Sequence, residues 1–369
     1  MPMLKQDKMT TDERWIALLN RQPVDRVPIY AIAAGYAGMN AGITVPDLYA
    51  DMYQVPMGHK FQDMLGWLRE QYGFQDFAAM GYANTGTMEF GGEMKLPSGE
   101  FSQALTIARL PVTTEEEAWS WKSPPDVKTA GVVPMMMEVS KMEAESGAPF
   151  LMILLVGAWD VACSICGIER LCKWTVRKPD VAHHVLRLAT DFNTQLLQYW
   201  VDTFGPERLV VFSTHAHTAG QIVGPKTFEE FCFPYIKENH DKMLAMGIKH
   251  TITHICGYHA LNYPMWAQIP MGDPGIVSVA HDTDEDWPTP LESVGKLFPN
   301  DIIMGNIEPA VFQIGTPGEV YELARQCIEV GKKHEAGYIL APGCELAPNA
   351  PPYNVWQMTK AVDDFGWYS

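Results

Sequence analysis

The sequence predicts an α/β fold of the (β/α)8 (TIM) barrel class. Short β-rich runs alternate with Gly- or Pro-containing loops and longer amphipathic stretches about eight times along the 369 residues. Several of these runs, such as Phe150–Val156, are almost continuously apolar, which is typical of strands buried on both faces of a parallel sheet. Strand, loop and helix repeated in this order over this length favour a barrel. We expect a single barrel domain over residues 1–369, with an N-terminal helical extension over about residues 1–25.

Seven strands stand out, and an eighth with a poorer pattern is expected between Phe77 and Phe90. The seven are Arg26–Ile32, Phe150–Val156, Leu209–Thr214, His250–His254, Ile276–Ala280, Ile302–Asn306 and Tyr338–Ala341. Helices are expected between them, and Thr, Glu or Pro residues typical of helix starts mark several of them. The clearest helices are Thr11–Asn20, Pro179–Phe204, Thr227–Met246 and Thr316–His334.

An open, doubly wound sheet is the alternative architecture. It would be favoured by a Gly-x-Gly-x-x-Gly segment that opens a helix after the first strand, and the sequence has no such segment there. A dinucleotide-binding fold therefore has no direct support.

Composition and charge exclude several classes of function. The formal net charge is −17, which disfavours binding to nucleic acid or to an anionic membrane surface. The longest apolar run, Pro149–Ala158, is too short to span a bilayer. The sequence has seven Cys, an odd number, and Met1–Trp15 has no apolar signal segment. We therefore expect a cytoplasmic protein whose cysteines are reduced.

The chemistry of a barrel lies at the carboxyl ends of its strands, and there the sequence offers a metal-ligand set. His254 and Cys256 close one strand at positions i and i+2, so their side chains can converge, and Cys344 follows the last strand. One imidazole and two thiolates match the ligands of a catalytic Zn²⁺ site that keeps a fourth position open. Taken alone, His-x-Cys is a weak signal and is better explained by a core His and two core Cys.

Other polar and aromatic residues follow the strands. His215, His217, Asp160 and Glu308 are candidates for catalytic and substrate-positioning roles, and the two histidines could alternatively bind metal. Tyr36, Trp159 and Tyr258 are candidates for packing against a substrate. Cys163 and Cys166 have the spacing of a redox or metal pair, but their apolar neighbours favour buried core thiols.

With these segments the chain resembles the uroporphyrinogen decarboxylase superfamily and, within it, the corrinoid-dependent methyltransferase branch. The resemblance runs from about Thr10 onward. It rests on the segments Arg26–Pro28, Gly224–Phe231, His254–Gly257, Met304–Pro309, Gly315–Val320, Ala341–Pro348 and Pro351–Asn354. That branch includes methylcobalamin:coenzyme M methyltransferases and the methyltransferase components of demethylating systems.

The resemblance implies a uroporphyrinogen-decarboxylase-like barrel with zinc bound by His254, Cys256 and Cys344. It also implies a partner corrinoid protein that carries cobalamin, with a methyl group passing between the cobalt and a small molecule held by zinc. The chain has no Asp-x-His-x-x-Gly segment of its own for cobalamin. Decarboxylation is disfavoured, because the Arg-rich segment that grips carboxylates in the decarboxylases is here Ala31–Asn40, without a basic residue.

The substrate is less sharply defined. Lys and Arg are scarce near the strand ends, where aromatic residues are common, so we expect demethylation of a neutral O-methyl compound such as a methoxylated aromatic. The alternative is transfer of a methyl group from methylcobalamin to a thiol such as coenzyme M. A hypothesis from another class is a non-catalytic zinc-binding barrel.

Overall fold

The structure is a computed structural model, and it describes residues 7–47, 63, 66–69, 72, 85–96, 105–280 and 290–368. The chain divides into two compact units, each described here by itself. Unit 1 comprises residues 1–78, 98–103 and 273–369, and unit 2 comprises residues 79–97 and 104–272.

Unit 2 is built on three parallel strands that pair in chain order. They are β3 (Leu151–Val156), β4 (Leu209–His215) and β5 (His250–Ile255), and all three are almost wholly buried. Leu151 pairs with Leu209, and Thr214 pairs with His254, so the carboxyl ends of the strands lie level. These strands confirm the predicted ones to within one residue at each end. The continuous apolar runs predicted them because both faces of each strand are covered.

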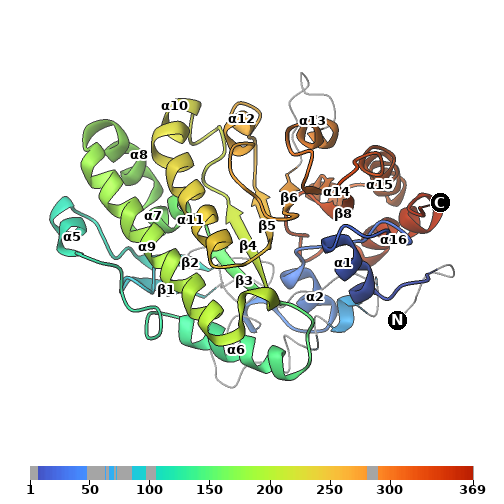
Figure 1. Cartoon of the computed structure of the whole chain (residues 1–369), viewed down its shortest axis with the longest axis horizontal. Coiled ribbons are helices and arrows are strands. Elements are labelled where there is room, and N and C mark those ends of the chain that lie inside the picture. The colour runs from blue at the N-terminus through green and yellow to red at the C-terminus, as the bar shows by residue number, and fades with distance from the viewer. Residues whose placement is uncertain are drawn as a thin grey trace. The chain divides into compact units, whose positions relative to one another are not determined.

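Helices and one hairpin surround these strands. The long helix α9 (Pro179–Phe204) has the predicted bounds and packs beside α7 (Ala158–Cys166) and α11 (Phe233–Ala245) (Figure 1). The shorter elements are β1 (Glu93–Lys95), β2 (Thr106–Arg109), α5 (Glu115–Ser120), α6 (Val133–Glu145), α8 (Ile168–Arg177), η1 (Pro206–Arg208), α10 (Pro225–Thr227), η2 (Phe228–Cys232) and α12 (Tyr263–Trp266). The first two form an antiparallel pair.

Unit 1 carries three further parallel strands in chain order. They are β6 (Ile276–Val279), β7 (Ile302–Ile307) and β8 (Tyr338–Pro342). Its helices are α1 (Thr11–Leu19), α2 (Ala34–Asn40), α13 (Pro290–Leu297), α14 (Pro309–Ile314), α15 (Pro317–Gly331) and α16 (Pro352–Phe365). Helices α15 and α16 pack against each other. A capping box begins α15, in which Thr316 and Glu319 satisfy each other's backbone N–H groups.

Three predicted elements differ from the structure. The expected strand Arg26–Ile32 forms only isolated bridges, in which Ile29 pairs in parallel with Leu340 of β8. Pro28 lacks the N–H needed to continue a ladder there. The expected helix Thr227–Met246 is divided into α10, the wider π-type turn η2 and α11, because Pro234 has no N–H to donate to the preceding turn. Of the expected strand between Phe77 and Phe90, residues 85–90 form turns, and residues 77–84 lie outside the described residues.

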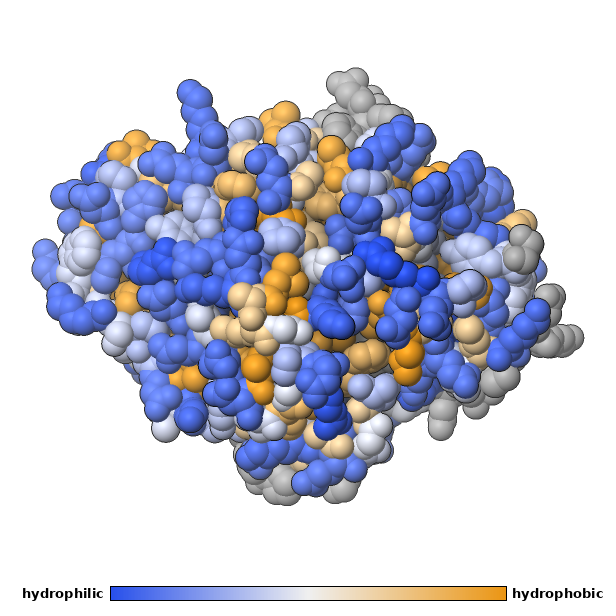
Figure 2. Space-filling model, viewed as in Figure 1, coloured by the Kyte–Doolittle hydropathy of each residue, from blue (hydrophilic) through white to orange (hydrophobic). Residues whose placement is uncertain are grey.

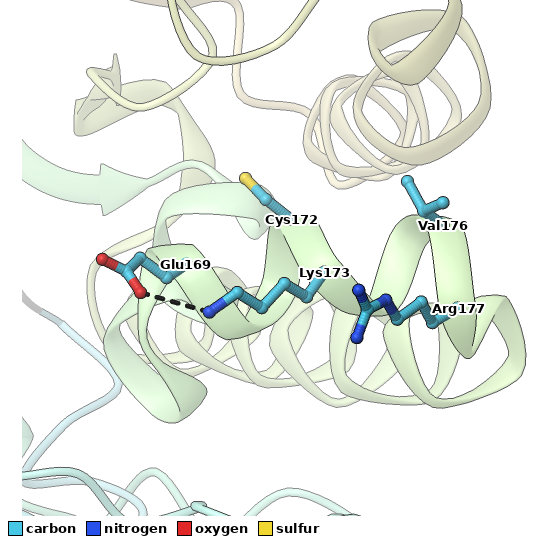
Figure 3. Close-up of a pocket in the computed structure, with 5 residues that line it drawn as sticks. All are labelled: Glu169, Cys172, Lys173, Val176 and Arg177. Atoms are coloured by element: carbon cyan, nitrogen blue, oxygen red, sulfur yellow. Dashed lines mark hydrogen bonds and ion pairs between the residues drawn. The ribbon is translucent and has the colours of Figure 1, made fainter.

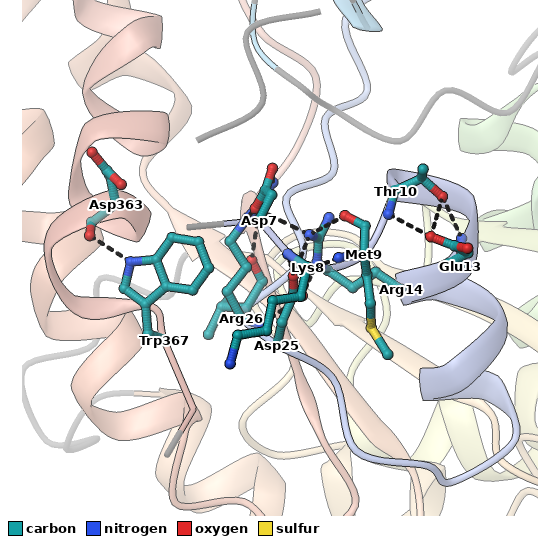
Figure 4. Close-up of polar contacts among 11 residues, drawn as sticks. Asp7, Lys8, Met9, Thr10, Glu13, Arg14, Asp25, Arg26, Asp363 and Trp367 are labelled. Carbon is teal, nitrogen blue, oxygen red and sulfur yellow. Dashed lines mark hydrogen bonds and ion pairs between the residues drawn. The ribbon is translucent and has the colours of Figure 1, made fainter. Parts of the chain in front are cut away.

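A buried group of four charged side chains lies in the N-terminal part of unit 1 (Figure 4). Arg14 Nε donates to Asp25 Oδ1 at 2.6 Å, and Arg26 Nε donates to Asp7 Oδ1 at 2.6 Å. Burial acts to raise the pKa of Asp25, but the Arg14 guanidinium and backbone N–H groups outweigh it and lower the pKa to about 2. These bonds fix α1 against the segment that leads to Ile29.

The face in Figure 2 is mainly hydrophilic, and its apolar residues are scattered in small groups. Within the described part of the chain, no helix combines the length and the apolar character needed to cross a membrane.

Candidate metal and substrate site

The carboxyl end of β5 presents two of the predicted metal ligands. His254 is the penultimate residue of the strand and is buried, and Cys256 follows the strand and is half-buried. Residues two apart in a strand point to the same face, so the imidazole and the thiol share one side of the chain. Gly257 has φ of +88°, and a Cβ there would lie 3.0 Å from the Cβ of Ala219, so a glycine suits the turn that follows.

Two buried residues, His259 and Trp266, hold the Cys256 turn in place, and sequence reasoning missed the first of them. His259 is fully buried, and its Nε2 donates a hydrogen bond to the carbonyl oxygen of Cys256 at 3.1 Å. Trp266 Nε1 donates to His259 Nδ1 at 3.1 Å, which leaves the proton of the neutral imidazole on Nε2. Burial lowers the pKa of His259 to about 4, so this donor is neutral at physiological pH.

Cys344, the third predicted ligand, lies in unit 1 directly after β8. Backbone bonds fix its loop, because Gly343 N donates to Ile307 O at 2.8 Å and Leu346 N donates to Ile32 O at 2.9 Å. The neighbouring Glu345 accepts a hydrogen bond from Gly35 N at 3.5 Å, and burial raises its pKa to about 7. Cys344 itself is half-buried.

The chemistry of the three side chains suits zinc. His254, Cys256 and Cys344 supply one imidazole nitrogen and two sulfurs, which are ligands that Zn²⁺ prefers. Two thiolates and a neutral imidazole would balance the charge of the ion. This set leaves one position of a tetrahedral ion for another ligand.

Asp160 and His217 come together in unit 2. Asp160 lies in the first turn of α7 and is 2% exposed. Its Oδ1 accepts hydrogen bonds from the backbone N of Ala216 at 2.9 Å and of His217 at 2.8 Å, and it lies 3.0 Å from His217 Nδ1. The Asp160 carboxylate raises the pKa of His217 although burial opposes it. The pair therefore orients the His217 ring, with Nδ1 directed at Asp160.

His215 is enclosed rather than presented to solvent. It is 1% exposed, its Nε2 lies 2.9 Å from Ser213 Oγ, and its ring meets that of Trp266 edge-on. A Cβ on Gly157 would lie 2.4 Å from its Nδ1, so the backbone after β3 approaches the ring closely. Burial lowers the pKa of His215 well below its usual range. A neutral His215 therefore packs against the backbone that follows β3. The catalytic role predicted for His215 stays a prediction.

The other predicted site residues lie in different surroundings. Tyr258 is half-buried, and its carbonyl accepts a hydrogen bond from Gly220 N at 2.7 Å, which joins the loops after β4 and β5. Trp159 in α7 and Tyr36 in α2 are fully buried. The Tyr36 hydroxyl bonds to that of Tyr72, and burial raises its pKa. Glu308 caps α14 by accepting a hydrogen bond from Ala310 N at 3.1 Å. Substrate contact by these residues stays a prediction.

Cys163 and Cys166 are buried free thiols in α7, as expected from their apolar neighbours. Burial raises the pKa of Cys163 well above its usual range and that of Cys166 to about 12. Both remain protonated at neutral pH, which disfavours nucleophilic or metal-binding roles.

A hollow of about 440 Å³ lies on α8, where no predicted site residue contributes. Figure 3 shows its lining side chains, all from that helix: Glu169, Cys172, Lys173, Val176 and Arg177. Lys173 pairs with Glu169 at 3.3 Å, and Val176 is 83% exposed. These side chains form an open helix surface, which offers no converging groups for catalysis.

Comparison with known proteins adds family and fold. The family model for uroporphyrinogen decarboxylase (URO-D) matches residues 10–365. The chain is 23% identical to the methylcobamide:CoM methyltransferase MtbA of Methanosarcina acetivorans, over 96% of this chain and 98% of that protein. It is 24% identical to the methylated-thiol–coenzyme M methyltransferase of Methanosarcina mazei, over 69% of this chain and 64% of that protein. Human uroporphyrinogen decarboxylase is 25% identical, over 52% and 49% of the two chains.

A solved structure, described as a methyltransferase from Methanosarcina mazei, matches with a TM-score of 0.77 and 20% identity. The match covers 97% of this chain and 99% of the other. Together with the family match and the parallel strands, this confirms the predicted α/β fold of the (β/α)8 barrel class.

Proposed function

The chain belongs to the uroporphyrinogen decarboxylase (URO-D) family, and we propose that it is a corrinoid-dependent methyltransferase. It transfers a methyl group between a small substrate and the cobalt of a separate corrinoid protein. The observation that carries this proposal is the pair His254 and Cys256, presented together at the carboxyl end of β5. The names of several relatives, which are methylcobamide:CoM methyltransferases, support the same class of reaction.

His254, Cys256 and Cys344 would hold Zn²⁺. The carboxyl ends of all strands of a (β/α)8 barrel belong to one rim, so residues that follow β5 and β8 are suited to share a ligand there. When bound, the ion supplies a Lewis acid for a substrate oxygen or sulfur. The bonds from His259 to Cys256 and from Leu346 to Ile32 keep the two ligand-bearing loops in place.

The chain's own polar residues position the substrate. Asp160 holds the His217 ring through Nδ1, so the opposite nitrogen, Nε2, is left to hydrogen-bond with a substrate. Glu308 and His215 are the remaining candidates for positioning roles, in keeping with their places after β7 and at the end of β4.

The substrate proposed first is a neutral O-methyl compound such as a methoxylated aromatic. Residues Ala31–Asn40, which follow the first predicted strand, contain no basic side chain to clamp an anion. The alternative substrate is a thiol that accepts a methyl group, and the names of the coenzyme M methyltransferases among the relatives favour it. The same lack of basic residues argues against a decarboxylase that grips several carboxylates.

Metal analysis and a methyl-transfer assay test the proposal. The purified chain should contain about one Zn²⁺. Cys344→Ser and Cys256→Ser should lose it, whereas the buried-thiol control Cys163→Ser should retain it. The chain is then incubated with Co(I) corrinoid protein and methoxylated aromatics, and separately with methylcobalamin and thiols. Zinc held by four protein ligands with no exchangeable position, together with no methyl transfer in either assay, would leave a non-catalytic zinc-binding barrel.

A further inference from the structure

A cavity of about 410 Å³ lies within unit 2, between α7, the start of α8 and the β2 hairpin strand. Most of its walls are apolar, and its polar contributors are Thr113, Ser164 and His217, with the protonated thiol of Cys163. The lining residues are Ile107, Ala108, Leu110, Thr113, Cys163, Ser164, Gly167, Ile168 and His217. An apolar cavity with a few polar groups is typical of a site for a small organic molecule.

Ser164 points to a ligand in this cavity. It is 1% exposed, and its Oγ has no hydrogen-bond partner among the residues that the structure describes. A buried hydroxyl without a partner costs free energy, which a ligand oxygen would recover. Asp160 lies one helical turn before Ser164 in α7, and its Oδ2 is also buried without a partner within the described part of the chain.

His217 is also oriented to bond to a ligand in this cavity. Its Nδ1 lies 3.0 Å from Asp160 Oδ1, so Nε2 is the ring nitrogen that remains for the cavity. The side chain can therefore form a hydrogen bond through Nε2 to a ligand in the cavity.

The cavity belongs to the same end of the strands as the proposed zinc ligands. Cys256 N donates to His215 O at 3.3 Å, and His217 follows His215 by two residues. Gly220 N donates to Tyr258 O, so the loop that carries His217 and the loop that carries Cys256 are held together. A molecule bound against His217 would therefore lie beside the turn that presents Cys256.

We propose that this cavity binds the ring of a methoxylated aromatic compound, with His217 Nε2 hydrogen-bonded to a ring-borne hydroxyl group and Ser164 Oγ bonding to another ring-borne oxygen. This inference rests on the function proposed above and selects an aromatic compound over a short thiol. The apolar walls fit a ring, whereas a short sulfonated thiol would leave much of the cavity unfilled and would meet no Lys or Arg in its lining.

Equilibrium binding, which requires no methyl transfer, tests the assignment. The probe is 2-methoxyphenol, titrated calorimetrically into the full-length protein, with a short sulfonated alkyl thiol as the competing ligand class. His217→Asn keeps a donor for Asp160 but removes Nε2, and it should weaken binding about tenfold. His217→Gln places an N–H near the position of Nε2 and should restore part of that loss. Leu110→Trp should fill the cavity and abolish binding.

Val176→Ala, on the exposed side of α8, is the control and should leave the Kd unchanged. Thermal unfolding of every variant verifies that it is folded. The inference is overturned if the wild type does not bind 2-methoxyphenol, or if His217→Asn and Leu110→Trp, both folded, bind it as the wild type does. If the protein then transfers methyl groups to thiols only, the proposed methyltransferase activity is still supported. Binding that depends on His217 without any methyl exchange would instead refute the methyltransferase and leave the cavity assignment standing.

Discussion

His259 donates a hydrogen bond from Nε2 to the carbonyl oxygen of Cys256 at 3.1 Å, and the donor is fixed in this tautomer by Trp266. The bond sets the direction in which the chain leaves β5. A proposed metal ligand is thus held by a buried histidine that is not itself a ligand. Such supporting bonds orient a ligand before the metal binds.

His259→Phe should weaken zinc binding by about tenfold, because Cys256 loses the bond that orients it. Competition with a chelator of known affinity measures this directly. His184→Phe is the matched control, since His184 bonds to Ala118 O and Trp121 O in another part of unit 2. Equal affinities in the two variants would show that the His259 bond does not support the metal site.

Gly157→Ala should destabilise unit 2 by about 1–3 kcal/mol, because the added methyl group would meet His215 Nδ1 at 2.4 Å. Trp266 lies on the ring's edge, so His215 has little room to move away. Urea unfolding gives the change in free energy. Gly318→Ala in α15 is the control, because a Cβ there lies 4.0 Å from its nearest neighbour and alanine favours a helix. A loss no greater than that of the control would mean that the His215 ring is free to shift.

The strands were predictable because their signal is local. The apolar run at residues 151–156 is continuous, and burial on both faces explains it. Pro28 shows where prediction from composition fails. The segment around Pro28 has the composition of a strand, but Pro28 lacks the N–H that a ladder needs, so the segment forms only isolated bridges. Likewise the π-type turn before Pro234 could not be read from helical periodicity.

The candidate site was predictable only in part, because only some of its features have a local signal in the sequence. Asp160 and His217 could be named because each directly follows a strand. Their mutual contact depends on how the two loops fold. His259 and Ser164 were missed because no local sequence pattern marks them. Their roles arise from a carbonyl group and a cavity that other segments supply.

The Asp160–His217 pair should make stability fall as pH rises above about 6.5. Asp160 raises the pKa of His217 above 6.5 in the folded state, so the folded protein holds the proton more tightly than the unfolded chain. The stabilisation is complete below the unfolded pKa and is lost as pH rises through the folded pKa. Urea unfolding of the wild type and of His217→Gln from pH 5.5 to 9 should give a difference that shrinks with pH. Asp160→Asn should abolish this trend; a trend that persists in it would assign the effect to another group.

Asp25→Asn should destabilise unit 1 by about 3 kcal/mol, because it leaves the buried Arg14 without the carboxylate that it contacts at 2.6 Å. The lowered pKa of Asp25, about 2 instead of 3.8, gives the pH dependence of the same interaction. Its stabilisation is complete above the unfolded pKa and is lost as pH falls from about 4 towards 2.

Asp273→Asn is the matched control, since Asp273 pairs with Arg21 on the surface, where the two side chains are 83% and 45% exposed. Asp273→Asn should lower the free energy of unfolding by less than about 0.5 kcal/mol. Urea unfolding at pH 7 and pH 2 compares the variants. Equal losses at pH 7, or an undiminished difference between wild type and Asp25→Asn at pH 2, would show that the buried group of charges in Figure 4 contributes no more to folding than an exposed ion pair.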